Sequence, residues 1–268
     1  MRVIRLLLIL VATAGLTACL DSTTLVKLKP DGSGTIEQTT LVNMASMKGM
    51  MPGAGAQGNA PMSNKEELER TAARMGKGVR LVSTEPIKGA NGFEGTKATF
   101  SFDDINQVEI SQDPNLSGGT NPNREPASKS ESPVKFNFSR TGGTSTLKID
   151  ITDRSAGAAK PEAGAPSDMP DLTNPMIMGM LKSMFQGFKI NIALEVVGAI
   201  VKTDAEYVAG PRITILEMDM AALLADEAKL KALQGKISAD ASFGAIKPYL
   251  KDIKGIKIDG PSITVEFK

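Results

Sequence analysis

The residues with the clearest capacity for chemistry lie near the N-terminus, in the run Leu16-Thr17-Ala18-Cys19. Two arginines, Arg2 and Arg5, precede an apolar stretch from residue 6 to residue 12, and small residues stand directly before the cysteine. A positive start, an apolar centre and small residues at a cleavage point are typical of an export signal that is removed from the mature protein. The one cysteine of the chain therefore falls where cleavage is expected.

Cys19 resembles the lipobox cysteine of bacterial lipoproteins, which follows Leu, a small residue and Ala or Gly. The resemblance implies diacylglyceryl on the Cys19 sulfur, cleavage after Ala18, and often acylation of the new amine. Each buried methylene contributes about 0.8 kcal/mol, so two or three chains such as palmitate hold a protein on a membrane where a single chain exchanges. In diderm bacteria an Asp after the cysteine resembles the inner-membrane retention signal. Leu20 in that position favours the periplasmic face of the outer membrane.

Two other interpretations fit this segment less well. An uncleaved membrane-spanning helix needs about 20 apolar residues, and Thr13, Thr17 and Asp21 interrupt the run before that length. An ordinary secretory signal could end at the same Ala18 and release a soluble protein that begins at Cys19. A lone exported thiol would then be unpaired in an oxidising compartment, which favours the lipoprotein interpretation.

Composition excludes several classes of function. The chain holds 31 Lys+Arg and 30 Asp+Glu, and loss of Arg2 and Arg5 with residues 1–18 leaves 29 against 30, so no electrostatic case for a nucleic-acid partner exists. The absence of histidine removes Ser-His-Asp and Cys-His relays and the usual zinc and non-haem iron ligands. We therefore expect no enzyme, no cofactor and no such metal site. Carboxylate-only glycoside hydrolysis stays possible in principle, but aromatics are 4% of the chain and tryptophan is absent.

The sequence predicts a signal peptide at 1–18, a lipidated tether at 19–23 and an ectodomain at 24–268. Within the ectodomain it predicts flexible segments at 44–62, 112–131 and 155–171. Alternating apolar residues and turn residues predict strands, and apolar residues at helical spacing predict helices. Strands are expected at 24–28, 35–43, 79–83, 95–102, 134–138, 146–151, 188–203, 212–217, 255–258 and 262–267, and helices at 63–76, 175–188, 219–235 and 243–250. Hairpins with inserted helices indicate an α+β fold of antiparallel strands, in one sheet or two.

Three further segments resemble bacterial lipoproteins that carry an LppM-like domain. They are Val26–Thr35, Gly95–Asp103, and Val196–Val201 ahead of Arg212–Ile215. The resemblance implies an α+β ectodomain at an envelope surface, with lipid or lipoglycan binding proposed for some members, and it transfers no catalytic residue. This chain departs from the pattern in having Val197-Gly198 where Pro-Gly is usual, and it lacks the further hydrophobic C-terminal helix of some members.

Methionine is the unusual side chain of this sequence. Met44, Met47, Met50 and Met51 recur at close spacing, and soft thioethers of this kind can bind Cu(I) in exported proteins. The same side chains also suit an adaptable apolar surface or a loop with no specific function. No His or Cys stands beside them as a co-ligand, which weighs against copper.

A second methionine-rich segment is the helix expected over 175–188. Its apolar stripe, which includes Ile177, Met180, Leu181, Met184 and Phe188, is widened by Met176, Met178 and Phe185 beyond the needs of a surface helix. We expect burial of this helix against the sheet. Any side left exposed would face the membrane, a partner or a bound acyl chain.

Two functions of different class follow from these observations. In the first, the lipid-anchored ectodomain binds a lipid or lipoglycan between the sheet and the methionine-rich helix, with Met180, Met184 and Phe188 as candidate ligand-binding residues. In the second, a structural or assembly lipoprotein docks on another envelope protein through the same surface. A concave pocket supports the first, and a flat apolar patch supports the second.

Overall fold

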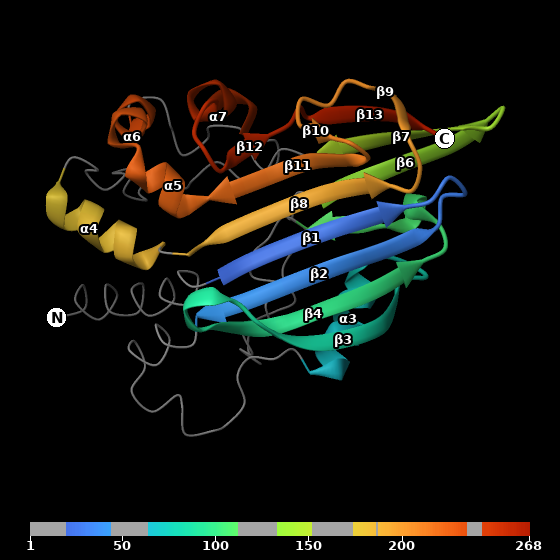
Figure 1. Cartoon of the computed structure of the whole chain (residues 1–268), viewed down its shortest axis with the longest axis horizontal. Helices are drawn as coiled ribbons and strands as arrows, with labels where there is room; N and C mark the ends of the chain where they lie inside the picture. Colours follow the sequence, from blue (N-terminus) through green and yellow to red (C-terminus); the bar gives the residue numbers. More distant parts are fainter. Residues whose placement is uncertain (1–19, 44–63, 112–132, 152–173, 186, 235–242) are drawn as a thin grey trace, which may run out of the picture.

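The computed structural model describes residues 20–43, 64–111, 133–151, 174–185, 187–234 and 243–268. Cys19 and the rest of the expected signal lie outside the described residues, as do the segments expected to be flexible at 44–62, 112–131 and 155–171. The fold is α+β, as the sequence predicts, with mostly antiparallel strands in two sheets (Figure 1). Short helices are inserted between the strands along the chain.

The larger sheet contains both the first described strand and strands from the C-terminal half. Its order is β10 (Val208–Ala209), β11 (Arg212–Asp219), β8 (Lys189–Val196), β1 (Leu20–Leu28), β2 (Gly34–Asn43), β4 (Phe93–Phe102) and β3 (Arg80–Lys88), and β12 (Ile256–Ile258) pairs with β11. The β1–β2 hairpin closes through Asp31, whose Oδ1 accepts from Ser33 N at 2.9 Å. β1 and β8 are parallel, with Asp21 opposite Lys189, which is an exception to the antiparallel pattern that we expect.

The smaller sheet is antiparallel. Its order is β5 (Glu109–Ser111), β6 (Pro133–Thr141), β7 (Thr144–Ile151), β13 (Ser262–Phe267) and β9 (Ile200–Thr203). Gly142 and Gly143 form the β6–β7 turn, as the sequence predicts, and both have positive φ angles. Two-residue hairpin turns require that conformation, which glycine adopts without strain.

A single large core lies between the two sheets. The larger sheet contributes Val26, Ile36 and Phe100, the smaller sheet contributes Leu147 and Ile149, and all five are fully buried. These residues alternate with half-buried or exposed ones along their strands, as expected where one face of a sheet is covered.

Helix α3 (Lys65–Met75) adds Leu68, Ala72 and Met75 to that core. Its N-cap is Asn64, whose Oδ1 accepts from Glu67 N at 2.8 Å. The sequence pattern of Ser63 followed by Glu66 three residues later predicts a capping box there, and this prediction places the N-cap one residue too early. The short 3₁₀ helices η1 (Ala90–Gly92) and η2 (Ile105–Gln107) flank β4.

The expected strand over 188–203 is two strands that belong to different sheets. Val197 N still donates to Leu28 O in the larger sheet, at 2.8 Å, whereas Ala199 exchanges hydrogen bonds with Lys268 at the end of the smaller sheet. Gly198 stands between them with φ +134° and an ideal Cβ position 2.0 Å from Lys268 O. The chain therefore crosses between sheets at a residue where no side chain fits.

A second crossing joins β12 to β13. The turn at Asp259-Gly260-Pro261 is present, but its two strands pair with different sheets and form no hairpin with each other. The segments on either side of residue 160 thus contribute strands to both sheets. The open question of one sheet or two is settled as two, built jointly by both halves.

Two expected boundaries are wrong. β1 begins at Leu20, so residues 20–23, which we expect to be a tether, are part of the sheet, and Leu20 itself is buried. The helix expected over 219–235 is divided into α5 (Met220–Ala225) and α6 (Glu227–Gln234). Asp226 interrupts it because its Oδ1 accepts from Lys229 N at 3.1 Å and so starts a new helix. Helix α7 (Phe243–Leu250) occurs where it is predicted.

Candidate functional site

Helix α4 (Pro175–Met184) carries the candidate ligand-binding residues. The sequence offers Thr173 or Asn174 as the N-cap before Pro175. The N-cap is Asn174, with Oδ1 accepting from Met176 N at 2.9 Å, and Pro175 occupies the first turn as predicted. The helix ends at Met184, four residues before the end that we expect. Phe188 therefore lies outside the helix and is buried, its ring edge-on to Phe185 at a centroid distance of 5.9 Å.

Helix α4 packs on other helices, which makes our expectation of burial against the sheet wrong. Met178 is 8% exposed and forms a small cluster with the buried Leu224 of α5 and Leu230 of α6. An ion pair at 2.9 Å between Lys182 Nζ and Glu227 Oε1 joins α4 to α6. The side of α4 that faces the protein is thus occupied by its neighbours' side chains.

The opposite side of α4 is open to solvent. Met176 is 83% exposed and Met180 is 56% exposed. Residues four apart lie on one face of a helix, and Met178, midway between them, lies on the other. Met180 is therefore placed as a surface contact. Met176, which the sequence marks only as widening the stripe, belongs to the same face, and the side chain of Met184 is outside what the structure describes.

Figure 1 places α4, α5 and α6 at the end of the larger sheet where β1 and β8 begin. We call this part of the molecule, with the first residues of those two strands, the helical end. β8 follows α4 within five residues, and its Lys189 pairs with Asp21. Asp21 is the second residue after Cys19 in the sequence. The exposed face of α4 and the point where the chain enters the sheet therefore share one end of the molecule.

A charge cluster joins the strands at the helical end. Lys189 Nζ lies 2.9 Å from Asp219 Oδ2, and Asp219 also caps α5 by accepting from Ala222 N at 3.1 Å. Burial raises the pKa of the Asp21 carboxyl, an effect that the Lys189 ammonium opposes and the Asp219 carboxylate reinforces. The hydrogen bond to Asp219 raises the pKa of Lys189. The cluster fixes α5 and the ends of β8 and β1 relative to one another.

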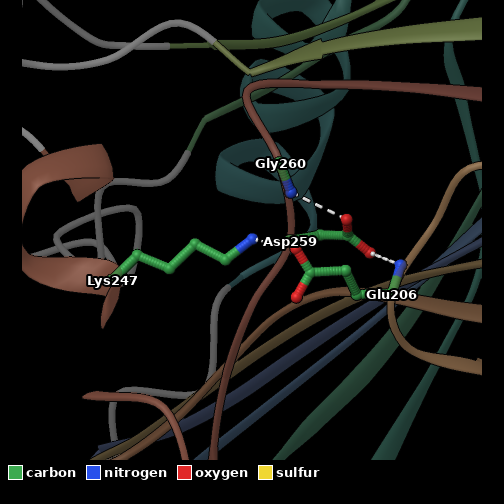
Figure 2. A network of polar contacts seen from close by, with 4 residues as sticks. All are labelled: Glu206, Lys247, Asp259 and Gly260. Atoms are coloured by element: carbon green, nitrogen blue, oxygen red, sulfur yellow. Dashed lines mark hydrogen bonds and ion pairs between the residues drawn. The ribbon is translucent and has the colours of Figure 1, made fainter. Parts of the chain in front are cut away.

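The buried carboxyl of Asp259 is a feature that the sequence does not predict. Its side chain is 5% exposed, and it is the one buried ionisable residue of the described part of the chain. Figure 2 shows its Oδ1 accepting from Gly260 N at 2.7 Å and its Oδ2 accepting from Glu206 N at 3.1 Å, while Lys247 pairs with Glu206. Asp259 thus holds the β12–β13 crossing against the loop that follows β9.

The Asp-Gly-Pro sequence predicts the turn, but nothing near it in the chain signals a loop 53 residues away as its partner. Burial raises the pKa of the Asp259 carboxyl above its ordinary 3.8, and main-chain N–H groups oppose this shift. Because each oxygen already accepts from the main chain, Asp259 gives no support to the carboxylate-only hydrolase that the sequence leaves possible.

We expect Asp259→Ala to lower the free energy of unfolding by about 2–4 kcal/mol, because the part-buried N–H groups of Glu206 and Gly260 lose their acceptor, at about 1–3 kcal/mol each. Urea titration followed by circular dichroism measures this change.

Since folding raises the pKa of the Asp259 carboxyl, the folded state favours the protonated carboxyl, and stability is lost as pH rises through the folded pKa. The wild-type protein should therefore lose stability relative to the non-titrating Asp259→Asn variant as pH rises above about 4. A constant difference across that window would contradict the shift.

Within the described residues no group of three or more His, Cys, Asp or Glu side chains is placed to hold a metal ion. Met44, Met47, Met50 and Met51, the residues of the Cu(I) interpretation, lie outside them. The described helices do not include one with the length and hydropathy of a membrane span.

Comparison with known proteins finds little. No family model matches the chain, and no curated protein matches it. Among solved structures it is similar to the folded domain of LppM from Mycobacterium tuberculosis, with 9% identity, a TM-score of 0.35, and coverage of 94% of this chain and 91% of that one. A likeness this distant assigns neither a family nor a function.

Proposed function

We propose that this protein is a lipid-anchored component of the bacterial envelope that acts by binding an amphiphile, without catalysis. The observation that carries the proposal is the lipobox-like run Leu16–Cys19 placed directly before β1, which begins at Leu20. With no tether between them, lipids on Cys19 hold the helical end close to the bilayer. The Leu20 position favours the periplasmic face of the outer membrane if the organism is diderm.

The binding site in this proposal is the exposed face of α4. Met176 and Met180 offer flexible, polarizable side chains that adapt to acyl chains. The non-catalytic role is supported by the absence of histidine from the whole chain, the commitment of its one cysteine to lipid, and the occupied oxygens of Asp259.

A structural or assembly lipoprotein is the second candidate. It is favoured by the same exposed methionines, because the inner side of α4 is filled by Leu224 and Leu230 and the methionines stand outward on the helix. An outward apolar face suits docking on an envelope protein as well as on lipid.

Native mass spectrometry of the full-length protein from its own membranes, beside a Cys19→Ala ectodomain exported behind an ordinary secretory signal, tests the proposal. We expect loss of residues 1–18, a covalent lipid increment on Cys19, and lipid bound to both forms, at low occupancy on the Cys19→Ala ectodomain. A Met176→Gln/Met180→Gln double variant, similar in side-chain length but polar, should carry less of that lipid.

Two results would count against the proposal. An unmodified Cys19 would remove the anchor. A lipidated Cys19 with an empty ectodomain would instead favour docking on another envelope protein.

A further inference from the structure

We propose that Met176 and Met180 of α4 insert into the same bilayer that carries the lipids of Cys19, so that the domain stands with its helical end on the membrane. The inference rests on the proposed function and deepens it, because it names the bilayer surface itself as the amphiphile. The acyl chains would then be one of two membrane contacts, and α4 the other.

The pairing of β1 with β8 places the two contacts together. Asp21 lies opposite Lys189 in a parallel ladder, and the last residue of α4 precedes Lys189 by five positions. Cys19 precedes Asp21 by two positions in the sequence, which is at most about 7 Å of extended chain. A bilayer holding lipids at Cys19 is thus within reach of the nearby helix without any rearrangement of the sheet.

The orientation of α4 supplies the second argument. Met178 points into the cluster with Leu224 and Leu230, so the helix is fixed on that side, and Met176 and Met180 must point away from the protein. Gly179 and Ser183 on the same outward side are small and exposed, and they place no bulky charged group between the two methionines and a membrane surface.

Other exposed apolar side chains of the described residues gather at the opposite end of the strands. Val197 follows the last residue of β8, and Val201 lies in β9, two residues after Ala199, which pairs with Lys268. Val208 lies in β10 near the start of β11, and Val82 lies where β3 pairs with the last residues of β4. The eight residues of β8 separate Val197 from the helical end, which is roughly 26 Å at 3.3 Å per residue. A membrane at the helical end would not reach these valines.

The lipid anchor makes a small contact sufficient. Once the chain is attached at Cys19, contact between α4 and the bilayer is an intramolecular event with a high effective concentration. Two methionines that would bind vesicles weakly on their own can then stay inserted, at the shallow depth typical of interfacial helices.

The chain has no tryptophan, so a single introduced tryptophan reports its own surroundings. The test uses lipidated full-length Met180→Trp in vesicles of phosphatidylethanolamine and phosphatidylglycerol, with or without bromine atoms on the acyl chains. The matched control is Val197→Trp, a similarly exposed apolar site at the opposite end of β8. Met176→Trp serves as a second reporter if Met180→Trp does not fold.

We expect brominated lipid to quench the position 180 tryptophan at least about twofold, as for a side chain inserted at an interface, and to leave the position 197 tryptophan almost unchanged. Equal quenching at both positions, or none at 180 with Cys19 lipidated, overturns the inference while the anchor stands; the second result favours a protein partner. Intact mass measured on the same samples identifies failure of the proposed function separately, because an unmodified Cys19 overturns both.

Discussion

Exported behind an ordinary secretory signal, the Cys19→Ala chain should leave the membrane fraction and be recovered in soluble form, whereas the native chain should sediment with membranes. The lipids expected on Cys19 dominate membrane affinity. Each chain of about 15 methylenes contributes roughly 12 kcal/mol at about 0.8 kcal/mol per methylene, so two or three chains make attachment effectively permanent. Fractionation and immunoblotting measure the distribution.

The exposed methionines cannot replace that attachment. Burying a methionine side chain completely contributes about 1.5–3 kcal/mol, and Met176 and Met180 can be buried only in part by shallow insertion. The soluble ectodomain should therefore bind vesicles weakly and reversibly, and Met176→Gln/Met180→Gln should abolish that residual binding. If the Cys19→Ala chain remained with the membranes through high-salt washing, a contact other than the lipid would hold the protein there.

Local chemistry made several elements predictable from the sequence. The β1–β2 and β6–β7 hairpins follow from turn residues such as Asp31 and Gly143, which act on their immediate neighbours. Pro175 likewise begins α4 as predicted, and Asn174 is one of the two N-cap candidates that precede it in the sequence. In each case the groups that form the structure are within four residues of one another.

Long-range pairing was not predictable, because a strand's apolar pattern does not identify its partner. The apolar run over 188–203 is continuous in sequence, but Gly198 divides it between two sheets. Val197, just before Gly198, donates to Leu28 O in the larger sheet, and Ala199, just after it, pairs with Lys268 in the smaller sheet. The candidate site shows the same limit. The sequence shows that the apolar stripe of α4 is wider than a surface helix needs. Only the packing of α4 on Leu224 and Leu230 determines which side faces outward and leaves Met180 exposed. Phe188, expected in the helix, is buried beyond its end.

We expect Gly76→Ala to destabilise the protein by about 3–5 kcal/mol, a large share of the 5–15 kcal/mol typical of a folded domain. The sequence predicts that the helix ends at Gly76 or Gly78, but not why alanine is excluded at Gly76. Gly76 has φ +136°, and its ideal Cβ position is 1.8 Å from Gln107 O, where it pairs with Val108. Alanine would therefore combine backbone strain of about 1–3 kcal/mol with a main-chain collision.

Gly78→Ala is the matched control, because Gly78 has φ +85° and nothing lies within 4 Å of its ideal Cβ position. It should lose only about 1 kcal/mol, from backbone strain alone. The difference between the two variants, measured by urea unfolding at equal m-value, gives the added cost of the collision with Gln107 O and of the more strained backbone at Gly76. Leu68, Ala72 and Met75 reach the core from α3. A shift of α3 away from Gln107 O, which would relieve the collision in Gly76→Ala, therefore displaces these core side chains as well. Equal losses in the two variants would mean that this junction yields without disturbing the core, and that α3 is held by its apolar face alone.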